Sequence, residues 1–327
     1  MNTLQIADLR VVLPGTERPV LDGVDLTVAS GETVALVGES GCGKTLTSRA
    51  ALGMVPPRAE ATGTVLVDGR DMLTLGARSL RRVRATTTAM IFQDPRAAIN
   101  PVRRIGDFLT EGLRLTGAWD KTRARERALT LLDAVGLKST VLRQYPHELS
   151  GGMLQRVMIA AALMADPVLL LADEPTTALD VTTQAEIIAL LGELQQRFGT
   201  AMLFVTHDLD LAAVIADRVA VMYAGRIVET GPAEEVFAAP KHPYTAALLA
   251  ASPRLDAPEP RLTVIPGRVP GLHTAISGCP FATRCGHADE RCATERPQST
   301  AVPGRAEAEV ACWNSESLIP QGGAAHG

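Results

Sequence analysis

The chain has 327 residues, 46% of them hydrophobic and only 3% aromatic, so it can form one large domain with an appendage around a mainly aliphatic core. Its formal net charge of −4 gives no long-range attraction for a phosphate backbone, which argues against a nucleic-acid-binding protein. The amino terminus lacks a signal-peptide pattern, and the longest apolar run, Val157–Ala165, is far below the roughly 20 residues that span a bilayer. We therefore expect a cytosolic protein whose five cysteines are thiols or metal ligands and which meets a membrane only through partners.

Apolar runs of strand length alternate with helical patterns along the chain, which predicts an α/β fold with a largely parallel sheet. A helix from Gly43 to about Met54 is expected after the first buried strand. The clear buried strands are expected at Thr33–Val37, Thr88–Phe92, Val168–Ala172 and Ala201–Thr206.

Between Asp94 and Gly152 the pattern is helical alone, as in Arg103–Leu115 and Lys121–Val135, so we expect a helical subdomain inserted into the α/β core. Later in the chain, Ala224-Gly225 separates two strand-like runs, Arg218–Tyr223 and Arg226–Glu229, and predicts a hairpin. The proline-rich stretch Ser252–Pro270 predicts a linker on the surface.

A glycine-rich loop follows the first predicted strand and fits the pattern G-x-x-x-x-G-K-[ST]. Glycines let the backbone curl so that successive amide N–H groups converge on phosphate oxygens, while the lysine can neutralise β and γ phosphates and the threonine can ligate Mg²⁺. The helix that follows directs its positive end at the same anion. The pattern therefore predicts a site for nucleotide phosphates, formed by Gly38, Glu39, Ser40, Gly41, Cys42, Gly43, Lys44 and Thr45. Cys42 occupies a variable position of the pattern and receives no redox role.

Two carboxylates, Asp173 and Glu174, end the apolar strand that begins at Val168. A buried strand that carries an acid at its carboxyl end places it beside the nucleotide. We expect Asp173 to hold Mg²⁺ and Glu174 to polarise the attacking water as general base.

The segment Leu149-Ser150-Gly151-Gly152-Met153-Leu154-Gln155-Arg156 closely resembles the signature motif of ABC ATPases. The other motifs of that family follow in order, with Gln93 as Q-loop, Ala178-Leu179-Asp180 as D-loop and His207 as switch histidine. The resemblance implies a P-loop NTPase fold of ABC type, in which Gln93 senses the γ-phosphate and the metal and His207 contacts the γ-phosphate. It also implies a dimer that sandwiches two ATP molecules, each between the phosphate loop of one chain and Ser150, Gly151 and Gly152 of the other, with Asp180 at the interface.

One feature departs from that family: no Phe, Tyr or Trp precedes Phe92, although ABC ATPases usually stack the adenine on an upstream aromatic ring. An aliphatic side chain near Leu13–Val20, or a residue of the partner subunit, would have to replace it.

Three further segments resemble the oligopeptide, dipeptide and nickel importers of the family: Phe92–Pro101, Tyr145–Glu148 and Lys241–Thr245. The expected division is an ATPase domain over residues 1–240, with its helical subdomain at about 94–157, and a carboxy-terminal extension over 241–327.

The resemblance implies a peripheral subunit on the cytoplasmic face of the membrane, which powers peptide import. Its implied partners are a second ABC ATPase, two transmembrane permeases that dock near Asp94–Leu115, and an extracytoplasmic substrate-binding protein. A nickel or other small-solute importer, and a soluble ABC ATPase, are the alternatives.

Four cysteines lie in the extension, at Cys279, Cys285, Cys292 and Cys312. Four clustered thiols in a cytosolic segment favour a metal or a cluster, and both zinc and iron–sulfur clusters accept four thiolates. The resemblance to proteins with this extension favours a 4Fe–4S cluster over zinc. His242 and His287 are expected to be surface residues.

Overall fold

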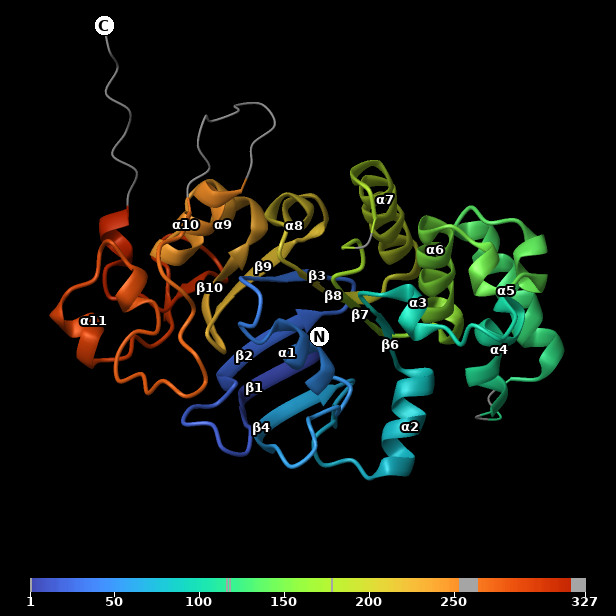
Figure 1. Ribbon diagram of the computed structural model, residues 1–327, viewed down its shortest axis with the longest axis horizontal. Coiled ribbons are helices and arrows are strands. Elements are labelled where there is room, and N and C mark those ends of the chain that lie inside the picture. The colour runs from blue at the N-terminus through green and yellow to red at the C-terminus, as the bar shows by residue number, and fades with distance from the viewer. Residues whose placement is uncertain (1, 116, 118, 178, 253–263, 319–327) are drawn as a thin grey trace, which may run out of the picture.

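A central sheet organises the molecule, and its middle strands are parallel (Figure 1). The structure is a computed structural model that describes residues 2–115, 117, 119–177, 179–252 and 264–318. The parallel strands are β3 (Thr33–Val37), β6 (Thr88–Ile91), β7 (Leu169–Asp173), β8 (Ala201–Thr206) and β9 (Arg218–Tyr223), with β6 at one edge of the sheet. They lie in the order β9-β3-β8-β7-β6, and every residue of β3, β7 and β8 is buried. Unbroken apolar runs are typical of parallel strands covered on both faces, and the predicted α/β sheet is confirmed.

The predicted hairpin is also present, between β9 and β10 (Arg226–Pro232). Its turn residues Ala224 and Gly225 have φ of 48° and 88°, and a Cβ on Gly225 would lie 2.3 Å from Val20 O. Only glycine fits the second position, which explains the turn.

A second, antiparallel sheet, which we did not predict, forms the amino-terminal part of the fold. Its strands are β1 (Asn2–Val12), β2 (Leu21–Ala29), β4 (Glu60–Val67) and β5 (Arg70–Asp71), in the order β2-β1-β4-β5. Its buried side chains, such as Leu4 and Val65, share one core with β3 and with α1 (Lys44–Ala50). The sheet thus supports the helix that follows the phosphate loop.

Helices occupy one end of the molecule, at the right of Figure 1. They are α2 (Ala77–Thr86), α3 (Pro95–Ala98), α4 (Ile105–Leu115), α5 (Lys121–Ala134) and α6 (Gly151–Ala162), with 3₁₀ turns at Ser139–Arg143, Pro146–Glu148 and Leu163–Ala165. Leu109 of α4, Leu131 of α5 and Val157 of α6 are buried in a common core. The predicted run of helices within the α/β sequence is therefore found. Two further helices, α7 (Val181–Phe198) and α8 (Leu209–Ile215), connect the strands that follow.

The carboxy-terminal extension lies at the opposite end of the molecule and is joined to the main sheet. It contains α10 (Pro243–Ala251), α11 (Glu290–Thr294), β11 (Thr300–Ala301), β12 (Glu309–Val310) and 3₁₀ turns at Ala282–Arg284 and Ser315–Leu318, and it follows α9 (Ala233–Ala238) of the ATPase domain. Strand β12 pairs with β10, and Tyr244 and Phe281 belong to the main core. Part of the predicted surface linker, residues 253–263, lies outside the described residues, whereas 264–270 do run along the surface.

One sequence expectation about the extension is wrong. His242 is not a surface residue: it is only 1% exposed, and its Nδ1 caps α10 by accepting a hydrogen bond from Tyr244 N at 3.0 Å. The first turn of α10 is buried, with Tyr244 in the main core, and it carries His242 into the interior. His287 is exposed, as expected. No helix in the described ranges is long and apolar enough to cross a membrane.

Candidate nucleotide site

The phosphate loop runs from the end of β3 to the start of α1, as its sequence predicts. Gly38 has φ of 150°, and a Cβ there would lie 2.2 Å from Met222 O, so this position accepts only glycine. Gly43 has φ of 116°, and a Cβ there would lie 2.6 Å from Leu21 Cδ2. Ser40 and Gly41 at the tip are exposed. The loop is thus held tightly at its two ends and open where an anion would enter.

Lys44 is 5% exposed and turns back over its own loop. Its Nζ donates to Gly38 O at 2.7 Å and to Glu39 O at 3.1 Å. The ammonium group is thereby positioned beside the loop amides, where it can neutralise phosphate oxygens.

Thr45 and Asp173 come together although they lie 128 positions apart: Thr45 Oγ1 donates to Asp173 Oδ1 at 3.0 Å. Burial raises the pKa of Asp173, against the lowering effects of the Thr45 hydrogen bond and the charge of Arg49. A hydroxyl and a buried carboxylate are oxygen ligands suited to Mg²⁺, and the cation would supply the positive charge that favours an ionised Asp173. This pair fits the metal of a Mg–ATP substrate.

Glu174 is the centre of a cluster formed by the ends of three strands. Its carboxylate Oε2 accepts hydrogen bonds from Gln93 Nε2 at 3.0 Å and from Thr177 Oγ1 at 3.0 Å, and His207 Nδ1 lies 3.4 Å away. The backbone of Glu174 is left-handed, with φ of 47°, and its N–H bonds to Val205 O at 2.9 Å. The structure therefore brings together all three residues predicted to be catalytic, and adds Thr177.

The phosphate loop, the Thr45–Asp173 pair and the cluster around Glu174 can together bind a nucleoside triphosphate and activate water beside it. Asp173 and Glu174 are consecutive, so the carboxylate that suits Mg²⁺ and the one that suits water lie at the same end of β7. An acidic pair next to a phosphate loop is the arrangement expected for phosphoryl transfer to water.

Comparison with known proteins identifies the relatives of the chain. Residues 21–177 match the ABC transporter family, and residues 228–292 match the family described as oligopeptide/dipeptide transporter, C-terminal region. The chain is 45% identical over 309 residues to the oligopeptide transport ATP-binding protein of Salmonella typhimurium, covering 93% of this chain and 92% of that protein. The corresponding protein of Haemophilus influenzae is 46% identical over 274 residues, covering 83% and 85%. The chain belongs to the ABC transporter family.

Solved structures agree with this assignment and with the fold. A protein from Clostridium perfringens that is part of an ABC transporter complex superposes with a TM-score of 0.64 at 27% identity, over 72% of this chain and 91% of that one. A dimeric ATP-binding cassette in a post-hydrolysis state, bound to ADP and Pi, gives 0.62 at 28% identity, over 70% and 98%. The P-loop fold and the ABC identity inferred from the motifs are confirmed, and the chain is an ABC ATPase.

The ABC signature residues start α6. Ser150 Oγ caps this helix by accepting from Met153 N at 3.3 Å, and Gly151 and Gly152 form its first turn. A Cβ on Gly152 would lie 2.9 Å from Thr183 Cγ2, so the glycine allows α6 to approach α7. Within the described chain no hydrogen bond links Ser150, Gly151 or Gly152 to the phosphate loop. Their predicted contact with the nucleotide of a second subunit stays a prediction.

The D-loop leads into α7. Asp180 caps this helix, accepting from Thr183 N at 3.0 Å and Thr183 Oγ1 at 2.8 Å, and these bonds lower the pKa of the carboxyl group. Ala178 lies outside the described residues. Asp180 therefore has a clear structural role, and its predicted interface role is untested.

The segment that lacks the adenine-stacking aromatic is held by the extension. The N–H groups of Glu17 and Arg18 donate to Leu272 O at 3.1 and 3.2 Å, and Arg18 Nη2 and Nε donate to Pro270 O at 2.6 Å and Gly271 O at 3.0 Å. The predicted aliphatic replacement near Leu13–Val20 is not tested by these contacts.

The four cysteines of the extension line one pocket, together with Phe281 and Trp313. Burial raises the pKa of all four thiols, that of Cys312 to about 11, and neighbouring cysteines add to this effect at Cys279, Cys292 and Cys312. One backbone donor already faces sulfur, because His287 N lies 3.4 Å from Cys285 Sγ. No group of three or more His, Cys, Asp or Glu side chains in the described ranges is arranged to hold a metal ion. Four thiols are the donors that an iron–sulfur cluster requires, but the structure does not show them arranged around a common metal position.

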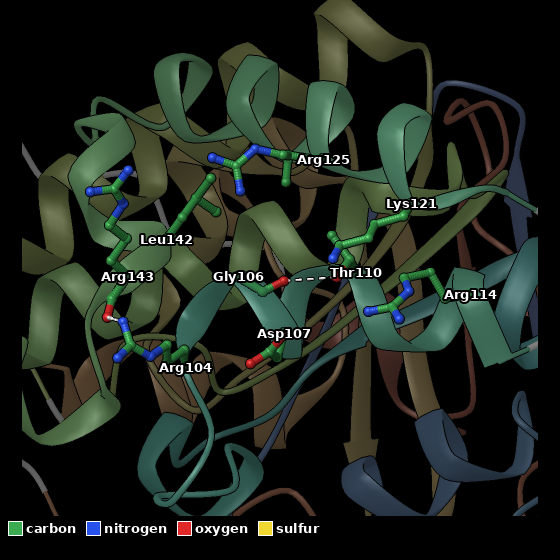
Figure 2. A pocket seen from close by; sticks show the side chains of 10 residues that line it. Arg104, Gly106, Asp107, Thr110, Arg114, Lys121, Arg125, Leu142 and Arg143 are labelled. Carbon is green, nitrogen blue, oxygen red and sulfur yellow. Dashed lines mark hydrogen bonds between the residues drawn. The ribbon is translucent and has the colours of Figure 1, made fainter.

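A different pocket lies between α4, α5 and the turn at Ser139–Arg143 (Figure 2). Five cationic side chains and one carboxylate line it: Arg104, Arg114, Lys121, Arg125, Arg143 and Asp107. The five cations form no ion pair with any described residue, and Arg104 Nη1 instead donates to Arg143 O at 2.9 Å. We call this the cationic pocket, because its charge is opposite to that of the whole chain.

An apolar groove runs along the other side of α4. It is lined by residues of α2, β6, α4 and α6, among them Ala89, Phe92, Phe108, Leu109, Gly112, Leu113, Met158 and Ala161. On α4, positions 108, 109, 112 and 113 face this groove, whereas 106, 107, 110 and 114 face the cationic pocket. This division follows the 3.6-residue period of the helix.

Proposed function

We propose that this chain hydrolyses ATP to power peptide import through a membrane transporter. The observation that carries ATP hydrolysis is the convergence of Gln93 and His207 on Glu174, beside the Thr45–Asp173 pair. The peptide substrate is supported by the match of residues 228–292 and by the names of the relatives.

The proposed reaction is an in-line attack of water on the γ-phosphorus of Mg–ATP. Glu174 accepts a proton from the water as its oxygen bonds to phosphorus, the bond to the bridging oxygen breaks, and ADP and phosphate leave. Gln93 and His207 orient the carboxylate and the transferred group, while Lys44 and the loop amides neutralise phosphate charge. Ser150, Gly151, Gly152 and Asp180 would complete the site of a second ATPase subunit.

We assign the docking of the two permeases to the apolar groove rather than to the cationic pocket (Figure 2). Burying apolar side chains that water still reaches, such as the exposed Phe92 and the half-buried Phe108, stabilises an association with the permeases. The chain would thereby lie on the cytoplasmic face of the membrane, with an extracytoplasmic binding protein delivering peptide from the other side.

We also propose that Cys279, Cys285, Cys292 and Cys312 hold a 4Fe–4S cluster, for which they supply the required four thiolates. All four cysteines line one pocket, which supports this assignment. When bound, the cluster would cross-link the segments that carry the four cysteines.

The docking proposal is tested by placing a negative charge on either side of α4. A Cβ on Gly112 would meet no atom within 4 Å, so a side chain can leave the helix there, and Gly112→Glu adds a carboxylate to the lining of the groove. We expect this variant to lose its permeases during affinity purification from native membranes, as measured by mass spectrometry, while the purified chain keeps its melting temperature.

Two matched controls separate charge, position and helix propensity. Gly112→Ala adds a side chain without charge, and Arg114→Glu adds the same carboxylate on the side of α4 that faces the cationic pocket. Both should retain the permeases and a second ATPase. Retention by Gly112→Glu as well would exclude the groove, and absence of permeases from the unmodified preparation would point to an ATPase that works alone.

A further inference from the structure

The phosphate loop is bound directly by the carboxy-terminal extension, through Arg284. The guanidinium Nη1 donates to Glu39 Oε2 at 2.7 Å and Nη2 donates to Glu39 Oε1 at 3.0 Å. Only 3% of the Arg284 side chain is exposed. A bidentate arginine–carboxylate pair fixes both position and orientation, so the second residue of the phosphate loop is tied to a segment 245 positions away.

The guanidinium group is itself held by neighbours that define its place. Its Nε donates to Pro266 O at 2.8 Å, and Nη1 also donates to Tyr223 Oη at 3.3 Å. The cation lies 5.7 Å from the centroid of the Tyr223 ring and 5.8 Å from that of Phe281. Arg284 therefore cannot follow Glu39 freely, and it fixes Glu39 rather than the reverse.

The extension binds the backbone of Glu39 as well. Glu39 N–H donates to Tyr244 Oη at 2.8 Å, and Tyr244 is fully buried against Tyr223 and Phe281, with ring centroids 4.6 and 5.3 Å apart. The carbonyl of the same residue accepts from Lys44 Nζ at 3.1 Å. Glu39 thus connects the extension to the lysine that is expected to contact the nucleotide.

Arg284 also belongs to the segment that forms the cysteine pocket. It precedes Cys285 directly, and its N–H bonds to Phe281 O at 2.9 Å within the turn that Cys279 begins. A shift of Cys279 or Cys285 must therefore move the backbone that carries the guanidinium group.

We propose that Arg284 is a positioning residue for the phosphate loop: it sets the geometry of the loop through Glu39 and couples nucleotide binding to the state of the cysteine pocket. The proposal rests on the function proposed above. It assigns no contact between Arg284 and the nucleotide. Because coupling between two sites is reciprocal, nucleotide binding must also stabilise the cysteine pocket.

The first test measures the dissociation constant of Mg–ADP by calorimetry, which requires no hydrolysis. Arg284→Gln should weaken binding roughly tenfold, within the usual range of coupling between sites. Arg284→Lys, which keeps the charge but not the bidentate geometry, should weaken it less. The double variant Arg284→Gln with Glu39→Gln should bind Mg–ADP no more weakly than whichever of its two single variants binds more weakly, because both changes remove the same ion pair.

Arg305→Gln is the matched control. Arg305 also joins the extension to the ATPase core, donating from Nη1 to Glu235 O at 3.2 Å, but it does not contact the phosphate loop. We expect this change to leave the affinity for Mg–ADP unaltered even if it lowers the melting temperature. Equal affinity for Arg284→Gln, Arg284→Lys and the unaltered chain would overturn the proposal, whereas failure of the unaltered chain to bind Mg–ADP would instead overturn the nucleotide site.

The second test measures alkylation of the four extension cysteines by iodoacetamide, resolved by mass spectrometry. Mg–ADP should slow this reaction in the unaltered chain and in Arg305→Gln, but much less in Arg284→Lys at saturating nucleotide. A merely structural arginine would leave the protection by nucleotide unchanged in all three proteins, and that result would contradict the coupling.

Discussion

Glu174 combines a left-handed backbone with a carboxylate that receives two hydrogen bonds. Replacing it by glutamine keeps the size of the side chain but removes the proton acceptor. Glu174→Gln should therefore leave Mg–ATP binding nearly unchanged and lower kcat by about 100-fold or more, as expected for loss of a general base. Phosphate release and equilibrium nucleotide binding measure the two effects separately.

Glu193→Gln is the control for this change, because Glu193 is exposed on α7, away from the site. Its hydrolysis rate should equal that of the unaltered chain. Near-normal hydrolysis by Glu174→Gln would mean that another group accepts the proton.

At this residue scale, the sequence identified the residues whose spacing is local. The phosphate loop is a contiguous pattern. Gln93, Glu174 and His207 each follow the carboxyl end of a parallel strand, so their meeting point follows from topology. Thr177 and the Glu39–Arg284 pair were not identified. Arg284 sits at an ordinary position between two cysteines, and only the folded chain brings it to residue 39.

At the scale of single elements, α10 begins with a buried neutral histidine. Burial lowers the pKa of His242 from 6.5 to about 3. The His242 imidazole therefore takes up a proton near pH 6.5 in the unfolded chain but only near pH 3 in the folded chain. The unfolding free energy must fall as the pH drops through this window, by at most about 1.4 kcal/mol per pH unit.

His242→Asn tests this dependence. Asparagine keeps an acceptor for Tyr244 N at the helix cap but does not titrate. Urea unfolding between about pH 7 and pH 4 should show a shallower loss of stability for the variant than for the unaltered chain. Other buried acids, including Glu229, are common to both proteins and cancel in the comparison. Identical slopes would show that His242 is protonated in the folded chain.

The elements themselves differed in how far the sequence predicted them. Strands β3, β7 and β8 are unbroken apolar runs and were predicted within one residue at each end. Strand β1 was missed, because register shifts and the positive φ of Asp8 interrupt its alternation of buried and exposed residues. Pairing with β2 and β4, which a local pattern does not encode, creates this strand.

At the scale of the whole molecule, the extension completes the ATPase core. Strand β12 continues the main sheet, and Phe281 packs against Tyr223 of β9 with centroids 5.2 Å apart. A boundary at residue 240 agrees with the change in composition, but the sequence could not show that the two parts share one core. Their contacts join positions far apart in the chain.

A bound cluster would strengthen this connection, and its removal is the corresponding prediction. Anaerobically purified protein should contain about four iron atoms per chain. Cys292→Ser should lose that iron and melt at a lower temperature, because the pocket then has only three thiolates. Cys42→Ser is the control, since Cys42 is buried in the phosphate loop and outside the pocket, and its iron content should be normal. Stoichiometric zinc would replace the cluster assignment, and absence of both metals would refute it.

The distance in sequence between Glu39 and Arg284 also has a consequence for synthesis. A ribosome that adds about 5–20 residues per second needs roughly 12–50 s to make the 245 residues between them. During that interval the nascent chain carries a phosphate loop without its arginine. The ATP site of a newly made subunit therefore matures late, only once translation has reached Arg284, and a chain stalled before residue 284 cannot complete it.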